Sequence, residues 1–195
     1  MQRTPAVGVD IGGTKIAFAL VDGYGTILQA LRLPTPVNEG TEAIFASIAQ
    51  GLRRLLDGYS ATLAGIGIGC PGHLNPHTGV VHFASNLGWR DVNLLDGIRR
   101  HYNTEQPIWL QQDVNAAILG EMTFGAARGQ RNAVMLTVGT GLGGAALLNG
   151  QLVTGNDNAG MEIGHMPLDP SGRICRCGMR GCPEMYVSGV GLLAG

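Results

Sequence analysis

The chain has 195 residues, of which 45% are hydrophobic and 14% are charged, and its formal net charge is -1. This size and composition predict a globular protein of one domain or two small ones, and the near-neutral charge gives no electrostatic basis for binding nucleic acid or a membrane surface. No apolar run approaches the roughly 20 residues of a membrane-spanning helix and nothing resembles a signal peptide, so a cytoplasmic protein is expected.

Three β-strands are predicted at the start of the chain. Apolar residues and the turns that bound them place these strands at 6–11, 16–21 and 27–33. The sequences GGTK at 12–15 and DGYG at 22–25 join them. Both joints carry the residues that tight turns require.

The GGTK turn combines groups suited to phosphate. Gly12 and Gly13 let the backbone approach a ligand closely, while Thr14 and Lys15, the only lysine, supply a hydroxyl and a positive charge. The spacing is not that of a Walker loop, and an ordinary hairpin turn explains the four residues as well. Asp10, which ends the first strand, is expected to act as an outer-shell anchor for magnesium.

A helix and a strand follow. Apolar residues recur at helical spacing over 41–59, and a strand is predicted at 63–70. Cys70 is interpreted as a small buried residue, because no cysteine or histidine lies near it at ligand spacing. The histidines of the next loop and hairpin show no pattern and are interpreted as surface residues; they are His73, His77 and His82.

An acidic residue stands where another strand passes into a helix. A helix is predicted at 94–102 and a strand at 108–111, followed by Gln112 and Asp113. Open α/β sheets place their ligand crevice at the carboxyl ends of strands, so Asp113 is a candidate catalytic residue. A helix N-cap is the alternative role, because aspartate is common at that position.

A second glycine-rich turn lies between strands predicted at 134–138 and 145–148. The sequence GTGLGG at 139–144 contains G-x-G-x-x-G, but a strand rather than a helix follows it, which disfavours a dinucleotide-binding loop. The other sequence elements of protein kinases are missing, which disfavours that class. A second backbone cradle for phosphate remains, and its candidate residues are Gly139, Thr140, Gly141, Gly143 and Gly144.

The two glycine turns belong to an internal repeat. ALVDG at 19–23 recurs as ALLNG at 146–150, and the same offset of 127 residues places Gly12 on Gly139. Two units of strand, glycine turn and strand predict duplicated lobes that grip the phosphates of a nucleotide.

The densest motif is a set of metal-ligand residues. His165, Cys175, Cys177 and Cys182 follow the spacing H-x9-C-x-C-x4-C. Three thiolates and one imidazole are the ligands of tetrahedral structural zinc, whose closed shell leaves no position for catalysis. A disulfide with one remaining thiol is the alternative, but a bridge between Cys175 and Cys177 would be strained, and no signal peptide indicates an oxidising compartment.

The stretch around these ligands resembles the signature of the ROK family of sugar kinases and repressors. EIGH at 162–165 is followed by CRCGMRGCPE at 175–184, which matches the family pattern C-x-C-G-x-x-G-C-x-E without gaps. The sequence QDVNAAILGE at 112–121 is similar to the family's N-D-A-N-A-A-x-x-G-E, with glutamine in place of the first asparagine. The resemblance extends across nearly the whole chain.

This resemblance implies roles for individual residues. Asp113 would be the general base, and zinc would hold the loop that contacts the sugar hydroxyls. The substitution at Gln112 sets the amide one methylene further out, so the bound hexose can differ from that of other members. The sugar contacts implied by the resemblance are Gly72, Asn86, Gln112, Glu162, His165 and Glu184.

The resemblance also implies an α/β, actin-like (ribonuclease-H-like) ATPase fold. Its two lobes are expected at 1–122 and 123–195, the second incomplete because ROK kinases are longer; a fragment and a natural truncation both remain open. The implied activity is ATP-dependent phosphorylation of a hexose, glucose first, at its 6-hydroxyl, with Mg²⁺ and structural Zn²⁺, in a chain expected to dimerise when full length.

Two alternatives to a kinase are open. The first is a ROK repressor, which binds sugar without phosphorylating it. Such repressors carry a helix-turn-helix ahead of the first strand; because that strand is predicted to begin by Ala6, no such element is expected here. The second is a zinc-stabilised interaction module without catalysis.

Overall fold

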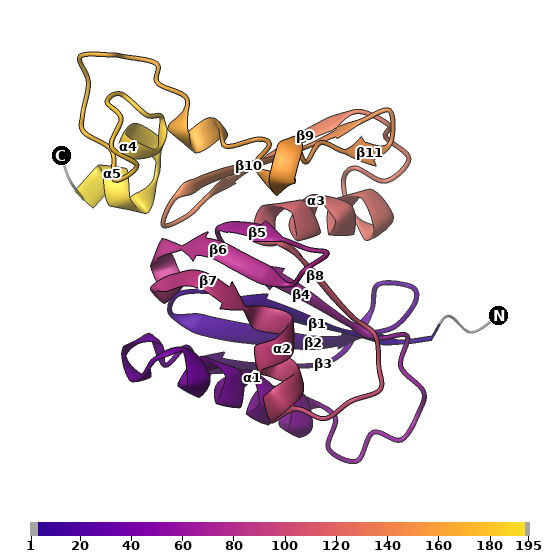
Figure 1. Ribbon diagram of the computed structural model, residues 1–195. Coiled ribbons are helices and arrows are strands. Elements are labelled where there is room, and N and C mark those ends of the chain that lie inside the picture. The colour runs from indigo at the N-terminus through magenta and orange to yellow at the C-terminus, as the bar shows by residue number, and fades with distance from the viewer. Residues whose placement is uncertain (1–3, 194–195) are drawn as a thin grey trace. The chain divides into compact units, whose positions relative to one another are not determined.

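The computed structural model describes residues 4–193. Its contacts divide the chain into two compact units, Met1–Ala116 and Ala117–Gly195. We call them unit 1 and unit 2 and describe each by itself (Figure 1). The division falls within helix α3 (Asp113–Phe124). The lobe boundary expected between 122 and 123 stays a prediction.

A five-stranded sheet, in the order β3-β2-β1-β4-β8, forms the frame of unit 1. The first three strands pair antiparallel, as their short glycine turns require, whereas β4 and β8 join β1 in parallel. The carboxyl ends of β1, β4 and β8 therefore meet at one edge. The strands are β1 (Ala6–Ile11), β2 (Lys15–Val21), β3 (Ile27–Pro34), β4 (Ile66–Cys70) and β8 (Ile108–Gln112).

Two helices share the apolar core of unit 1 with this sheet. Phe18 on β2 lies so close to Gly51 that a Cβ there would overlap its ring, and Phe45 meets Gly97 in the same way. Both rings are almost fully buried. Each contributes roughly 1.5–3 kcal/mol to folding by leaving water. The helices are α1 (Thr41–Leu55), which carries Gly51 and Phe45, and α2 (Leu94–His101), which carries Gly97.

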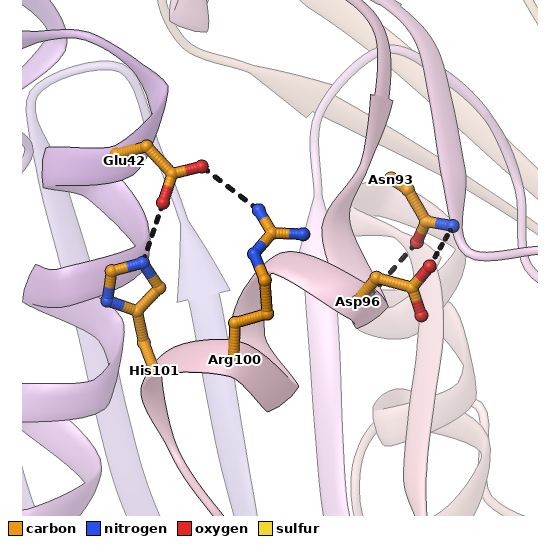
Figure 2. Close-up of polar contacts among 5 residues, drawn as sticks. All are labelled: Glu42, Asn93, Asp96, Arg100 and His101. Atoms are coloured by element: carbon orange, nitrogen blue, oxygen red, sulfur yellow. Dashed lines mark hydrogen bonds and ion pairs between the residues drawn. The ribbon is translucent and has the colours of Figure 1, made fainter.

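Polar contacts join the two helices at the surface. Glu42 of α1 bonds to His101 at 2.7 Å and to Arg100 at 3.0 Å (Figure 2). The hydrogen bond from His101, followed by that from Arg100, lowers the pKa of Glu42. Asn93 caps α2, since its side-chain oxygen accepts the N–H of Asp96 at 3.1 Å. Glu42 and Arg100 are largely exposed, so their ion pair orients the helices more than it stabilises them.

A small antiparallel sheet completes unit 1. Trp89 begins its last strand, is 2% exposed, and lies 5.8 Å from the ring of Phe45 between centroids. Its role is therefore in packing. The remaining elements are β5 (His73–Asn75), β6 (Val80–Ala84), β7 (Trp89–Asn93) and two 3-10 helices, η1 (Val37–Glu39) and η2 (Ser85–Leu87).

Unit 2 contains a three-stranded antiparallel sheet in the order β11-β10-β9, together with a long irregular loop and two short helices. Ser188, whose backbone is extended, separates the two helices. Beyond α3, the elements are β9 (Ala133–Val138), β10 (Leu142–Leu148), β11 (Gln151–Leu152), η3 (Asn156–Asn158), η4 (Ile163–His165), α4 (Glu184–Val187) and α5 (Gly189–Leu193).

Some predicted boundaries were wrong. The helix predicted over 41–59 ends at Leu55, and the strand predicted from 63 begins at Ile66. The strand predicted from 145 begins at Leu142, because Gly143 and Gly144 pair with Thr137 and Leu136 of β9. Glycine does not prevent a strand where the neighbouring strand supplies hydrogen bonds, so the glycine turn is shorter than its sequence suggests.

Candidate active-site groups and a candidate metal centre

Two candidate acids lie together at the carboxyl ends of the parallel strands of unit 1. Asp10 on β1 pairs with Gly69 on β4, which in turn pairs with Gln111 on β8. A Cβ built on Gly69 would lie 3.8 Å from Oδ1 of Asp10 and 3.6 Å from Cα of Asp113. Both acids therefore lie close to Gly69 at the end of β4.

The pKa of the neighbouring Cys70 reflects the proximity of the same two acids. Its thiol is fully buried, and burial, followed by the charges of Asp113 and Asp10, raises its pKa far above the ordinary range. The thiol is therefore neutral, which agrees with its interpretation as a small buried residue. Partial burial of its carboxyl also raises the pKa of Asp10, and the charge of Lys15 offsets part of that shift.

Asp113 is the first residue of α3 and is half-buried. Its Oδ1 accepts the N–H of Val114 at 2.8 Å. A standard N-cap side chain accepts from two or three residues further on, so this bond is not the usual capping arrangement. Gln112, also half-buried, ends β8, and its N–H is held by the side chain of Gln111 at 2.8 Å.

The GGTK turn is fixed by hydrogen bonds within unit 1. The N–H of Gly12 donates to the carbonyl of Lys15 at 2.9 Å, and the hydroxyl of Thr35 donates to the carbonyl of Gly12 at 2.6 Å. A Cβ on Gly13 would lie 2.9 Å from the carbonyl oxygen of Asn86. The close approach that Gly13 permits is thus made by Asn86, and the structure brings these two candidate residues together. Thr14 and Lys15 remain exposed.

Gly72, the remaining candidate in unit 1, serves a turn. Its φ of +93° is a conformation that favours glycine, and a Cβ there would overlap the carbonyl of Phe83. The turn after β4 is therefore packed against β6, whatever ligand it meets.

In unit 2, the four predicted metal ligands converge. The ligand atoms of His165, Cys175, Cys177 and Cys182 all lie within 4.8 Å of one another. Nδ1 of His165 is 3.6 Å from Sγ of Cys175, and Sγ of Cys177 is 3.6 Å from Sγ of Cys182. Metal–sulfur bonds of about 2.3 Å place two ligands of a tetrahedron about 3.8 Å apart. Two of the ligand pairs therefore lie close to the spacing expected in a tetrahedral zinc site.

The spacing of the sulfur atoms in the cluster favours a cation over a disulfide. All four cysteines are free, and a bridge would require sulfur atoms about 2.05 Å apart. Burial, followed by the neighbouring thiols, raises the pKa of Cys182 to about 12 without a metal. A zinc ion bound by these residues would supply the positive charge that stabilises neighbouring thiolates.

The local fold positions these ligands from two directions. His165 ends the 3-10 helix η4, while the cysteines come from a tight turn in which the N–H of Cys175 donates to Met179 at 2.8 Å and the N–H of Gly178 donates to Cys175 at 3.0 Å. Cys175 and Cys182 are buried with Met185 in a small cluster. The ligands thus form the centre of the irregular loop.

Two acids flank the ligands. Glu162 is exposed and immediately precedes η4. Glu184 is half-buried, and its Oε2 accepts the N–H of Leu142 at 3.0 Å. Sequence reasoning missed this last contact. Its only signal was the place of Glu184 two residues after a ligand, which does not reveal a partner 42 residues away.

The glycine turn between β9 and β10 spans only Gly139, Thr140 and Gly141, because Val138 already pairs with Leu142. The N–H of Gly139 donates to the carbonyl of Gly141 at 3.0 Å. Gly139 and Thr140 are exposed. Of the expected cradle residues, Gly143 and Gly144 lie in the strand instead, where they pair with Thr137 and Leu136 of β9.

The family of the chain can be established by comparison with known proteins. The model of the ROK family matches residues 6–195. The chain belongs to the ROK family. Over 96% of its length it is 39% identical to a glucokinase of Thermotoga maritima and 34% identical to a xylose repressor of Bacillus subtilis. It spans 58% and 49% of the lengths of these two relatives.

Solved structures confirm the predicted fold. A ROK family glucokinase from Streptomyces griseus, in complex with glucose and AMPPNP, matches 97% of this chain with a TM-score of 0.86 at 36% identity, and the chain covers 59% of that structure. The α/β fold is thus the actin-like ATPase fold of ROK sugar kinases. Within residues 4–193, no helix is both long and apolar enough to cross a membrane.

Proposed function

We propose that the chain carries sugar- and phosphate-binding groups of an ATP-dependent hexose kinase, with glucose as its first candidate substrate. The observation that carries the proposal is the placement of Asp113 and Asp10 on either side of Gly69, at the carboxyl ends of β1, β4 and β8. This is where open α/β sheets bind their ligands. The glucokinases among the relatives support the same reading.

Each group has a distinct role in the proposed reaction. Asp113 accepts the proton of the sugar's 6-hydroxyl, which makes that oxygen a better nucleophile. Asp10 anchors the hydrated Mg²⁺, which when bound neutralises charge on the transferred phosphoryl group. Backbone N–H groups of the turns at 12–15 and 139–141 hold phosphate oxygens, and Lys15 adds a positive charge.

The remaining candidates bind the sugar or shape the site. Hydroxyl recognition is assigned to candidate residues of each unit, and the metal cluster gives the loop of unit 2 its shape without taking part in the chemistry. The proposed sugar contacts are Gly72, Asn86, Gln112, Glu162, His165 and Glu184.

A replacement at Asp113 tests the proposal. Asp113→Asn keeps the shape of the side chain but cannot accept the proton, so ADP release should fall by about two to four powers of ten. Glucose affinity, measured by calorimetry, should change far less. The assay uses the whole protein that the gene encodes. Asp96→Asn, which alters an exposed acid on α2, is the matched control. Near-normal ADP release from Asp113→Asn would show that the carboxylate is not the base.

A sugar-binding regulator is the second candidate, because a xylose repressor is 34% identical over 96% of the chain. The same assay separates the two. A wild-type chain that binds glucose but releases no ADP with glucose, N-acetylmannosamine, fructose or allose would replace the kinase proposal with the regulatory one.

A further inference from the structure

The two ends of the glycine turn in unit 2 are held by residues adjoining the metal ligands. The turn connects β9 to β10, and Leu142 is the first residue of β10. Both the N–H and the carbonyl of Leu142 are contacted from the metal loop. The two contacts come from opposite sides of that loop, one beside Cys182 and the other beside His165.

The first contact is made by Glu184. Its Oε2 accepts the N–H of Leu142 at 3.0 Å, and a Cβ on Gly141 would lie only 2.6 Å from the same oxygen. The carboxylate therefore rests directly on the turn, at a position where only glycine leaves room for it. A hydrogen bond from a backbone N–H to a carboxylate is roughly twice as strong as a neutral one.

The second contact is made by the helix that carries His165. Gly164 packs on Leu142 so closely that a Cβ would overlap the Leu142 carbonyl. The side chain of Ile163 lies over Gly144, where a Cβ would approach its Cδ1 to 2.5 Å. The start of β10 thus packs closely against η4.

The segment after the last metal ligand supplies further contacts to the turn. The N–H of Gly189 donates to the carbonyl of Gly139 at 2.8 Å. The hydroxyl of Ser188 donates to the carbonyl of Glu184 at 2.7 Å and accepts the N–H of Gly191 at 3.2 Å. The backbone that presents Glu184 is therefore itself fixed, and the turn is held at Gly139 as well as at Leu142.

We propose that Glu184 is a positioning residue for the turn at 139–141, and that metal binding at the cluster sets the shape of this turn through it. A phosphate-binding turn works only if its N–H groups point at one place, which a three-residue glycine turn does not ensure by itself. The consequence for phosphate binding rests on the function proposed above. The positioning itself does not.

This role differs from a sugar contact in what a variant does. Glu184→Gln keeps an oxygen that can accept the Leu142 N–H and loses only the charge, whereas Glu184→Ala loses the acceptor. If Glu184 positions the turn, Gln restores what Ala removes. If it serves only to bind a sugar hydroxyl, neither variant affects the turn.

Amide hydrogen exchange on the ¹⁵N-labelled 195-residue chain measures the contact directly. The Leu142 amide should exchange about tenfold or more faster in Glu184→Ala, the size expected for loss of a charge-assisted hydrogen bond, and should recover most of its protection in Glu184→Gln. Glu162→Ala, which alters the other acid of the same loop, is the control and should leave Leu142 unchanged. Equal exchange rates in all variants would overturn the positioning role.

Metal removal tests the second half of the proposal. Chelation should speed exchange of the Leu142 and Gly139 amides in the wild type, although neither residue is a ligand. Restoring zinc should reverse the change. Chelation should add little at Leu142 in Glu184→Ala, because the contact is already lost. Unchanged exchange at Leu142 after complete removal of the metal would show that the turn keeps its shape independently.

A titration with inorganic tripolyphosphate separates this proposal from the proposed function. Binding at the turn should shift the amide signals of Gly139 and Gly141, more weakly in Glu184→Ala than in Glu184→Gln. If the wild-type turn shows no shift, the phosphate role fails while the exchange results still decide positioning. If phosphate binds equally well to wild type and Glu184→Ala, the coupling fails while the phosphate role stands.

Discussion

The two repeats of the molecule use the same strand pattern with opposite results. An offset of 127 residues carries β1 onto β9 and β2 onto β10 with identical bounds. Val7, Val9 and Ile11 of β1 are 1%, 2% and 1% exposed. Their equivalents in β9 are 69%, 57% and 64% exposed, and they are Val134, Leu136 and Val138. The alternation of apolar residues thus predicts a strand, but it does not predict whether other elements bury the apolar face of that strand.

The hairpins of the two repeats also differ by one residue. Ile11 pairs with Ile16 across a four-residue turn, whereas Val138 pairs with Leu142 across three. Because side chains alternate between the faces of a strand, this slip changes which residues of the second strand share a face with the first. The duplicated sequence therefore does not produce duplicated faces.

The units differ as well in what holds them together. Unit 1 has a continuous apolar core that joins the sheet to α1, α2 and the small sheet. In unit 2, the described cluster at the irregular loop consists of Cys175, Cys182 and Met185, and it surrounds the proposed metal. Stability in unit 1 is thus expected to come from apolar burial, and order in this loop from metal coordination.

Metal removal should produce the largest difference between the two units. Purified chain should contain about one zinc per molecule, and Cys177→Ser should lower both the metal content and the thermal stability of unit 2, since structural zinc contributes folding energy. Both tryptophans, Trp89 and Trp109, lie in unit 1. Their fluorescence should therefore change little on chelation, while amide signals of the loop at 160–184 are lost. Elemental analysis showing no zinc, with Cys175 and Cys182 oxidised, would contradict the assignment.

The sequence predicts some of these features well because they are local. The spacing of His165, Cys175, Cys177 and Cys182 limits how far apart the ligands can lie, and the structure brings them together as expected. The bounds of β1 follow from apolar runs that end at turns. The chain also places Asp10 and Asp113 each at a strand end, but their proximity depends on β4 lying between β1 and β8.

Other features could not be predicted because they depend on contacts between distant segments. The bond from Leu142 to Glu184 spans 42 residues, and no pattern in either segment indicates it. Gly13 seemed suited to a ligand, yet its open side is taken by Asn86. Glycines suggest close approach, but the sequence does not say by what.

Substitutions at a matched pair of valines should change the stability of the two units by different amounts, and this difference is expected to be of intermediate size. Val7→Ala removes buried methyl groups and leaves a cavity, so it should lower the free energy of unfolding of unit 1 by about 2–3 kcal/mol. Val134→Ala, the equivalent change on an exposed side chain, should alter unit 2 by less than about 0.5 kcal/mol. Urea titrations followed by tryptophan fluorescence for unit 1 and by amide signals for unit 2 measure both. A large loss of unfolding free energy from Val134→Ala would show that the apolar face of β9 is buried against another surface in solution.

The smallest expected difference concerns the glycines that open the two turns. A Cβ on Gly12 would lie 3.0 Å from the carbonyl oxygen of Lys15, the acceptor of its own N–H bond at 2.9 Å, so Gly12→Ala must lengthen that bond. We expect a loss of about 1 kcal/mol. A Cβ on Gly139 meets nothing within 4 Å, and its φ lies outside the range that strains other residues. Gly139→Ala should therefore be neutral or stabilise unit 2 by about 0.4–1 kcal/mol, because alanine restricts the unfolded chain. The same urea titrations apply, and equal losses from both variants would mean that the turns are built alike despite their difference of one residue.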